Sequence, residues 1–180
     1  MVQDDGDHLL FVYGSLMHEP SLLRTLAHRR LPPTGAPFEV RDWERAWDCV
    51  SRRTFTLAGA TDGVVHRRVV LGLRPRAGAA CEGVVFHLDA RDLAALGQRE
   101  LAYELVELEH AGAFDRLIVT FVPLRSRTIE RSNSVEPLVI EQAYLDECRS
   151  GAVAHGLNDA QRDLETVPSG LPVVAAANPT

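Results

Sequence analysis

The stretch Phe11-Val12-Tyr13-Gly14-Ser15-Leu16 ends the first apolar run of the chain, which begins at His8. An apolar run that stops at a glycine is typical of a buried strand followed by a turn, so we predict a strand over 8–13. Glycine permits a tight backbone and close approach of a ligand. Successive exposed N–H groups in such a turn can hold a carboxylate or a polarised carbonyl. A purely structural turn fits the same residues, and the sequence matches neither the phosphate-binding glycine loop nor the G-x-S-x-G motif.

After this turn, the hydrophobic pattern predicts many strands with helices interspersed irregularly among them. A short helix is expected next, with Pro20 near its first position. Further strands are predicted at 38–41, 45–50, 69–73, 82–88, 103–109 and 117–122, and helices at 89–99, 138–149 and 157–164. Because regular crossover helices are missing, a doubly wound parallel sheet is excluded. The order predicts an α+β fold with a small mixed or antiparallel β-barrel and helices packed on it.

Length and composition favour one globular domain. The chain has 180 residues, of which 46% are apolar and 24% charged, and its formal net charge is −6. We expect a single domain over 1–167 and name 168–180, rich in Ala, Pro and Val, as a candidate disordered tail. The net charge gives no general attraction to nucleic acid or anionic membrane, so neither is an expected partner. We interpret Arg29-Arg30 and Arg52-Arg53 as solvated surface pairs.

The N-terminus and the cysteines indicate where the protein is located and which kinds of scaffold it lacks. Residues 1–8 are acidic and resemble no signal peptide, and no apolar stretch has the ~20 residues of a membrane helix, so we expect a cytoplasmic protein. Cys49, Cys81 and Cys148 are widely spaced and form no C-x-x-C motif, which argues against a zinc site and a disulfide scaffold. Cys81 and Cys148 each lie within an apolar pattern, so we expect them to be buried core thiols, with a catalytic thiol as the alternative.

Glu100 is the candidate acid/base residue. Asp89 suits the N-cap of the predicted helix. From there Leu93, Leu96 and Glu100 recur at i, i+3 and i+7, on one face of the helix. A carboxylate on the face toward the core or a cleft has a raised pKa, which suits a general base.

A structural alternative for Glu100 stays open at this point. In that alternative Gly97 ends the helix, and Glu100 lies on the surface or pairs with Arg99. The seven histidines form no H-x-x-x-H or H-E-x-x-H pattern, so no metal site is expected. Ser15 lacks an identifiable His and Asp arrangement, so we interpret it as a turn residue or a hydrogen-bond donor to substrate.

Four short motifs, in order along residues 9–165, resemble the gamma-glutamylcyclotransferase superfamily, including its ChaC-like branch. They are Phe11-Val12-Tyr13-Gly14-Ser15-Leu16; Val70-Leu71-Gly72-Leu73 with Cys81-Glu82-Gly83-Val84-Val85-Phe86; Gln98-Arg99-Glu100 with Tyr103; and Tyr144-Leu145 with Ser150-Gly151-Ala152 and Gly156-Leu157. The chain departs from the ChaC-like branch at His18, and the segment 51–68 matches that branch poorly, so the resemblance does not imply glutathione as the substrate.

The resemblance implies a barrel-like mixed fold and an activity. The loop Tyr13, Gly14, Ser15 and Leu16, together with Tyr103, would bind the gamma-glutamyl group, and Glu100 would carry the proton transfers. The implied reaction releases 5-oxoproline and an amine or amino acid, with a small gamma-glutamyl amide as substrate and neither a metal nor an organic cofactor. The alternatives are a cyclotransferase acting on gamma-glutamyl amines, such as one on a natural-product precursor, and a non-catalytic binding module on the same fold. The sequence assigns neither the leaving amine nor the oligomeric state.

Overall fold

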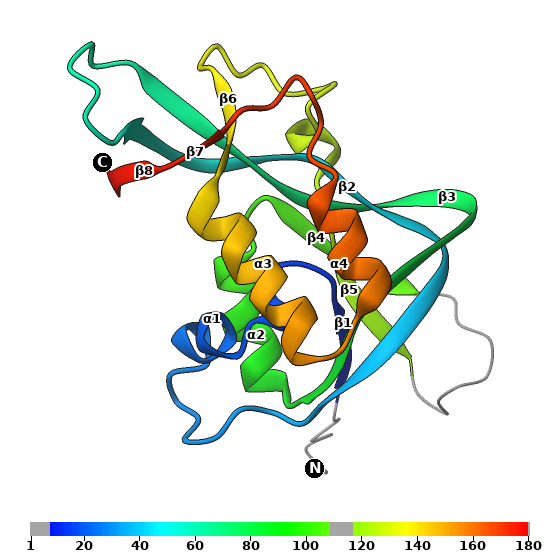
Figure 1. Cartoon of the computed structure of the whole chain (residues 1–180). Coiled ribbons are helices and arrows are strands. Elements are labelled where there is room, and N and C mark those ends of the chain that lie inside the picture. The colour runs from blue at the N-terminus through cyan, green and yellow to red at the C-terminus, as the bar shows by residue number, and fades with distance from the viewer. Residues whose placement is uncertain (1–7, 109–116, 180) are drawn as a thin grey trace.

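Residues 8–108 and 117–179 are described by a computed structural model, in which helices pack against one large mixed sheet (Figure 1). The strands are β1 (His8–Val12), β2 (Gly35–Leu57), β3 (Val65–Leu88), β4 (Tyr103–Leu108), β5 (Ile118–Pro123), β6 (Leu138–Glu141), β7 (Val173–Val174) and β8 (Ala176–Pro179). The α-helices are α1 (Glu19–Thr25), α2 (Ala90–Arg99), α3 (Gln142–Ala154) and α4 (Asn158–Glu165), and the short 3-10 helices are η1 (Ser15–Met17) and η2 (Arg125–Arg127). The predicted α+β class with a mixed sheet is confirmed. None of the described helices is both long and apolar enough for a membrane span.

The first strand lies in the middle of the sheet, in the order β4-β5-β1-β3-β2-β8. It pairs antiparallel with β3 and parallel with β5, and Leu9, Leu10 and Phe11 are almost completely buried. A strand with neighbours on both sides and both faces covered reads as a continuous apolar run, which is why this segment shows no alternation. The turn after Val12 therefore starts from a rigid position.

The two longest strands, β2 and β3, each combine two strands that the sequence predicted separately. They pair with each other antiparallel along most of their length, with a register shift between Arg41 and Trp43. At that shift Asp42 has a positive φ of 61°, and its side chain accepts a hydrogen bond from the N–H of Gly78 at 2.7 Å. Polar residues at this bend break the apolar pattern, although the ladder continues through it. The paired strands β2 and β3 extend beyond the helices, as Figure 1 shows.

Helix α3 lies against the short helix η1, which follows β1. The contact is close because Gly151 has no side chain: a Cβ there would lie 2.7 Å from the backbone N of His18. Helix α4 packs on α3, and α2 packs on α1 (Figure 1). These contacts bring the end of β1, the start of α3 and the end of α2 to one side of the sheet.

Two segments differ from the sequence-based expectation. The helix predicted over 138–149 is wrong for its first four residues, which form β6 beside Arg67 and Arg68 of β3. Val139 and Ile140 are buried there, and β-branched residues favour a strand in a sheet. In the tail from residue 168, the described part contains β7, paired with β6, and β8, paired with β2. Backbone pairing with existing strands gives this segment a place in the sheet despite its weak pattern.

Candidate active site

The loop Tyr13–Leu16 is fixed by contacts on both sides. The Tyr13 hydroxyl donates a hydrogen bond to the Phe121 carbonyl at 2.6 Å, and Arg45 Nε donates to the Tyr13 carbonyl at 2.8 Å. Burial raises the pKa of Tyr13 well above its usual value, so the hydroxyl remains a donor. Gly14 precedes η1, and no side chain caps that helix. The first N–H groups of a helical turn have no partner within the turn, so this loop offers backbone donors.

Glu100 ends helix α2 as its C-cap residue. Its N–H donates to the Leu96 carbonyl at 2.9 Å, and the Glu100 carbonyl accepts from the N–H of Tyr103 at 2.9 Å. Its side chain is only 15% exposed. Burial raises the pKa of the Glu100 carboxyl, while the positive charges of Arg99 and Arg53 oppose that rise. The helix continues through Gly97, so the alternative in which Gly97 ends it is wrong, and the expected pairing with Arg99 is present alongside burial.

Arg99 joins the elements around Glu100. Its Nε lies 3.1 Å from Glu100 Oε1, and its Nη2 donates to Ser15 Oγ at 3.2 Å. Other N–H groups of the same guanidinium donate to the carbonyl and hydroxyl of Ser21 and to the hydroxyl of Thr25 in α1. A rigid planar guanidinium holds several acceptors at fixed angles. Arg99 therefore fixes the carboxylate of Glu100 relative to the loop.

Two partly buried tyrosines, Tyr103 and Tyr144, bracket the backbone of Leu71 in β3. The Tyr103 hydroxyl donates to the Leu71 carbonyl at 2.6 Å, and the Tyr144 hydroxyl accepts from the Leu71 N–H at 3.1 Å. Burial raises the pKa of both phenols well above the usual value, so neither serves as a base near neutral pH. The Tyr144 ring comes from α3 and stands over the loop, where a Cβ added to Gly14 would lie 3.2 Å from its hydroxyl oxygen.

Two adjoining cavities meet at this point. The small cavity, of about 40 Å³, is lined by the loop residues Tyr13–Leu16 and by Glu100, Tyr103 and Tyr144. The large cavity, of about 820 Å³, shares Ser15, Glu100, Tyr103 and Tyr144 with it and extends over β2, β3 and α3. A water molecule occupies roughly 30 Å³ in the liquid, so the small cavity accepts one polar group of a ligand and the large cavity the remainder.

All six residues predicted for the site line the small cavity, and three of them also line the large one: Tyr13, Gly14, Leu16, and the shared Ser15, Glu100 and Tyr103. The sequence patterns did not predict that Tyr144 and several arginines, among them Arg53 and Arg68, line the large cavity. Arg52-Arg53 was interpreted as a surface pair; both side chains are exposed, but they line this cavity. The Tyr144-Leu145 motif was noted, and its aromatic residue was the available signal for a place in the site.

A catalytic thiol is disfavoured by the surroundings of all three cysteines. Cys49, Cys81 and Cys148 are free and completely buried, and burial raises their pKa values to about 12, 11 and 12. Catalytic thiols instead have depressed pKa values and partial exposure. The expectation of buried core thiols is confirmed.

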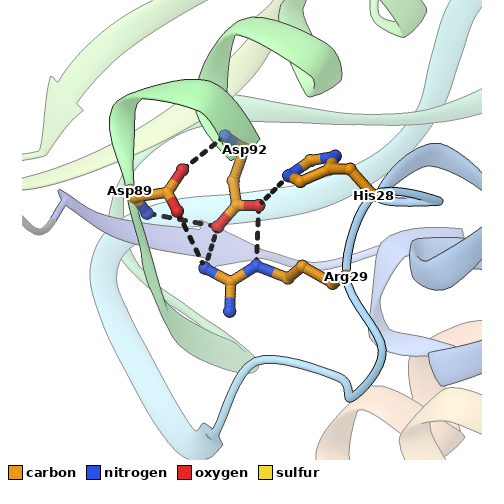
Figure 2. A network of polar contacts seen from close by, with 4 residues as sticks. All are labelled: His28, Arg29, Asp89 and Asp92. Carbon is orange, nitrogen blue, oxygen red and sulfur yellow. Dashed lines mark hydrogen bonds and ion pairs between the residues drawn. The ribbon is translucent and has the colours of Figure 1, made fainter.

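One cluster outside the cavities has the composition of a metal site. His28, Asp89 and Asp92 place ligand atoms within 4.8 Å of one another. Figure 2 shows that Arg29 occupies this cluster: its Nε donates to Asp92 Oδ1 at 2.7 Å and its Nη2 to Asp92 Oδ2, while His28 Nε2 lies 3.0 Å from Oδ1. A guanidinium already neutralises the buried carboxylate of Asp92, so we assign the cluster to the placement of α2.

Comparison with known proteins identifies the fold. No family model matches the chain, and no curated protein matches it. A solved structure of a gamma-glutamyl cyclotransferase, however, aligns with a TM-score of 0.61 over 90% of this chain and 88% of that one, at 15% identity. The chain has the gamma-glutamyl cyclotransferase fold. The resemblance seen in the four motifs is therefore confirmed at the level of the fold.

Two further structures share this fold. YkqA from Bacillus subtilis aligns with a TM-score of 0.60 at 20% identity, over 93% of this chain and 56% of that chain. An uncharacterised protein from Homo sapiens aligns with a TM-score of 0.59 at 16% identity, over 90% of this chain and 88% of that chain. Likeness at such low identity establishes how the chain folds, and the chemistry has to be argued from the site itself.

Proposed function

We propose that this protein is a gamma-glutamylcyclotransferase, which converts a small gamma-glutamyl amide to 5-oxoproline and a free amine. The observation that carries the proposal is the position of Glu100. Its largely buried carboxylate lies where the small and large cavities meet, beside a loop with backbone donors. A pocket with convergent polar groups and a perturbed carboxyl is the expected form of an active site.

The reaction needs two proton transfers, and in this proposal Glu100 makes both. The α-amine of the substrate attacks the γ-amide carbonyl carbon, forming the ring C–N bond and a tetrahedral oxyanion. The ring nitrogen carries a positive charge once its lone pair has formed the new bond; Glu100 removes a proton from it, and the resulting carboxylic acid gives that proton to the leaving nitrogen as the oxyanion re-forms the carbonyl and the original amide C–N bond breaks. A carboxyl whose pKa is raised toward neutrality suits both the base and the acid role.

In this mechanism the loop Tyr13–Leu16 stabilises the oxyanion. The small cavity has room for about one polar group, and the loop backbone from Gly14 to Leu16 lines it. Backbone N–H groups held rigidly toward the developing negative charge lower the barrier, because they need no reorientation as the charge forms. Tyr13 and Tyr103 use their hydroxyls in structural hydrogen bonds, so in this mechanism they shape the cavity rather than transfer protons. Ring closure is already unimolecular, and the enzyme has only to hold the folded conformer.

The test is Glu100→Gln, which preserves size and removes the basic and acidic functions of the side chain. We expect turnover to 5-oxoproline to fall by about 10²–10⁴-fold, the usual contribution of general acid–base catalysis. The matched control is Glu104→Gln, an exposed glutamate on β4, which should leave turnover unchanged. Assays in chelating buffer test the expectation of metal independence at the same time.

The products distinguish the alternatives. A screen of gamma-glutamyl amides by mass spectrometry should detect 5-oxoproline with the wild-type protein. Free glutamate would indicate a hydrolase, and binding without any product would indicate a non-catalytic module. Normal turnover in a folded Glu100→Gln protein would contradict the proposed mechanism.

A further inference from the structure

The side chains that line the large cavity have an excess of positive charge. Three ion pairs lie along it, Arg24 with Glu147, Arg68 with Glu141 and Arg99 with Glu100. Every glutamate in the lining has an arginine partner in these pairs. Arg52 and Arg53 remain, and neither forms an ion pair with a carboxylate within residues 8–108 and 117–179. The cavity therefore has two uncompensated guanidinium groups.

An irregularity of the β2–β3 ladder turns both groups toward the cavity. Val50 pairs with Val69 and Thr54 with Arg67, so Ser51, Arg52 and Arg53 lie opposite Arg68 alone. Neighbouring residues of a regular strand point to opposite faces. A bulge of this kind re-aims side chains and is common beside active sites. Here it allows three consecutive residues of β2 to line one space.

Arg68 and Arg53 form a pair of like charges in this part of the cavity. Arg68 is mostly buried, and its Nε makes no hydrogen bond within the described residues. Its pKa is lowered, by burial first and by the charge of Arg53 second. Two nearby guanidinium groups of like charge create a site that an anion in the cavity would stabilise.

The anion site and the catalytic carboxylate are close together but on different parts of the cavity system. Arg53 is near enough to Glu100 to oppose the rise in the pKa of its carboxyl. Arg52, Arg53 and Arg68 line the large cavity and not the small one beside the loop. If the gamma-glutamyl group binds at the loop Tyr13–Leu16, with its reacting carbonyl in the small cavity, the leaving amine extends past Glu100 into the large one.

We propose that Arg52 and Arg53, backed by Arg68, form a subsite for a carboxylate on the leaving amine. This inference rests on the proposed function and assigns its substrate class: gamma-glutamyl amides of amino acids, rather than of neutral or cationic amines. The segment that holds these residues, 51–68, is the one in which the sequence departs from the ChaC-like branch. The residues that we propose to set the substrate specificity therefore lie in a segment that this chain does not share with the ChaC-like branch.

A pair of substrates that differ only in charge tests the subsite. Gamma-glutamyl-alanine carries the carboxylate, and gamma-glutamyl-alaninamide replaces it with a neutral amide of the same size. We expect kcat/KM to favour the acid by about tenfold or more, since a charge-assisted hydrogen bond contributes on the order of 1.4 kcal/mol, which is a factor of ten. In Arg53→Gln the ratio of the two kcat/KM values should fall to about twofold; an effect of Arg53 through Glu100 is common to both substrates and cancels in this ratio. Arg41→Gln removes an exposed charge from the same strand, outside the cavity, and should preserve the preference.

Equal use of both substrates by the wild-type protein would overturn the subsite, as would an Arg53→Gln variant that slows both substrates equally. Calorimetric binding of both compounds to Glu100→Gln supplies a readout without turnover. If no 5-oxoproline forms from either compound but the acid binds more tightly and Arg53→Gln abolishes the difference, the proposed function fails and the subsite stands. Equal binding of both compounds overturns the subsite, whatever the activity.

Discussion

Glu100 combines burial with a nearby positive charge, and the balance between these two effects sets its chemistry. Burial raises the pKa of its carboxyl and is the larger effect, while Arg99 at 3.1 Å limits the rise. A carboxyl with a raised native pKa binds its proton more tightly in the folded than in the unfolded state. Ionisation of Glu100 therefore costs stability, and that cost appears as the pH rises above the ordinary value near 4.5.

This balance predicts a pH dependence of stability. In urea unfolding at a series of pH values, the wild-type protein should lose stability relative to Glu100→Gln as the pH rises from about 4 through the raised pKa of Glu100. Below that window, where Glu100 is protonated in both states, the two proteins should differ by a constant amount. A stability difference independent of pH would show that the carboxyl titrates normally. Glu104→Gln, on an exposed residue, is the control.

Gly14 gives a second prediction at the residue scale. A valine there would place its Cβ 3.2 Å from the Tyr144 hydroxyl oxygen, and its methyl groups would project into the small cavity. We expect Gly14→Val to fold and to lose at least about tenfold in kcat/KM, equivalent to about 1.4 kcal/mol of transition-state binding. In α2, a Cβ on Gly97 meets nothing within 4 Å, so Gly97→Val is the matched control. Unchanged kcat/KM in a folded Gly14→Val protein would remove the loop from the site.

At the same scale, the sequence predicted some site residues and not others for physical reasons. Glu100 was found because helical spacing relates it to Leu93 and Leu96, a local rule that holds through the end of α2. The cavity position of Arg53 depends on a bulge, which is defined by pairing with β3 rather than by local pattern. No property of the dipeptide Arg52-Arg53 distinguishes a cavity wall from a solvated surface.

Among the elements, α2 is the one on which the site depends most, and it is held at both ends. At its start Asp89 and Asp92 form a reciprocal capping box, and Arg29 and His28 bind the buried side chain of Asp92 (Figure 2). At its end Arg99 contacts α1 and the loop. The capping residue Asp89 was predicted from the sequence. The partners of Asp92 lie more than 60 residues away and were not.

This anchoring predicts a large effect of Asp92→Asn. The variant leaves Arg29 with only the exposed carboxylate of Asp89, at 3.4 Å, as a charged partner, so we expect a loss of about 1–3 kcal/mol of unfolding free energy. Burial by itself raises the pKa of Asp92, but the hydrogen bonds from Arg29 and from the Asp89 N–H lower it overall. The stabilising effect is therefore present above about pH 4 and lost as the pH falls through the native pKa.

The control for this prediction is Asp89→Asn. Its side chain is 54% exposed, and asparagine is as good an N-cap as aspartate, so we expect a change below about 1 kcal/mol. Denaturant unfolding at neutral and at acidic pH measures both variants. If Asp92→Asn lost no more stability than Asp89→Asn at neutral pH, the network would not anchor the helix.

Element lengths were harder to predict than element types. Most strands and helices lie where the periodicity placed them, because each buries its own apolar face. Strands β2 and β3 were each predicted as two shorter strands. Polar residues around Asp42 interrupt the apolar pattern there, while the backbone pairing of β2 with β3 continues. Strand β6 was also not predicted, because its four residues are too few to show a period and it is pairing with β3 that makes them a strand.

On the scale of the whole molecule, one extensive apolar core joins the sheet to the helices around it. It includes Leu10 of β1, Leu73 of β3, Leu96 of α2 and Leu145 of α3. The site forms where these elements converge, so its geometry depends on the entire core rather than on a separate local unit. The three cysteines lie in different places, Cys49 in β2, Cys81 in β3 and Cys148 in α3, and each is completely buried.

Burial of all three cysteines predicts that the native protein reacts slowly with thiol reagents. With pKa values of about 11 to 12, their thiolate fraction near neutral pH is very small, and burial excludes the reagent as well. We expect an aromatic disulfide reagent to react with no thiol of the native protein on the timescale of minutes, and with all three in concentrated guanidinium chloride. Labelling sites identified by mass spectrometry at intermediate denaturant show whether the three regions open together. The alkylating agent iodoacetamide should likewise leave the proposed cyclotransferase activity intact under native conditions. Rapid native labelling of Cys49, which packs beside Tyr103, together with loss of activity, would contradict both the buried site wall and the carboxylate mechanism.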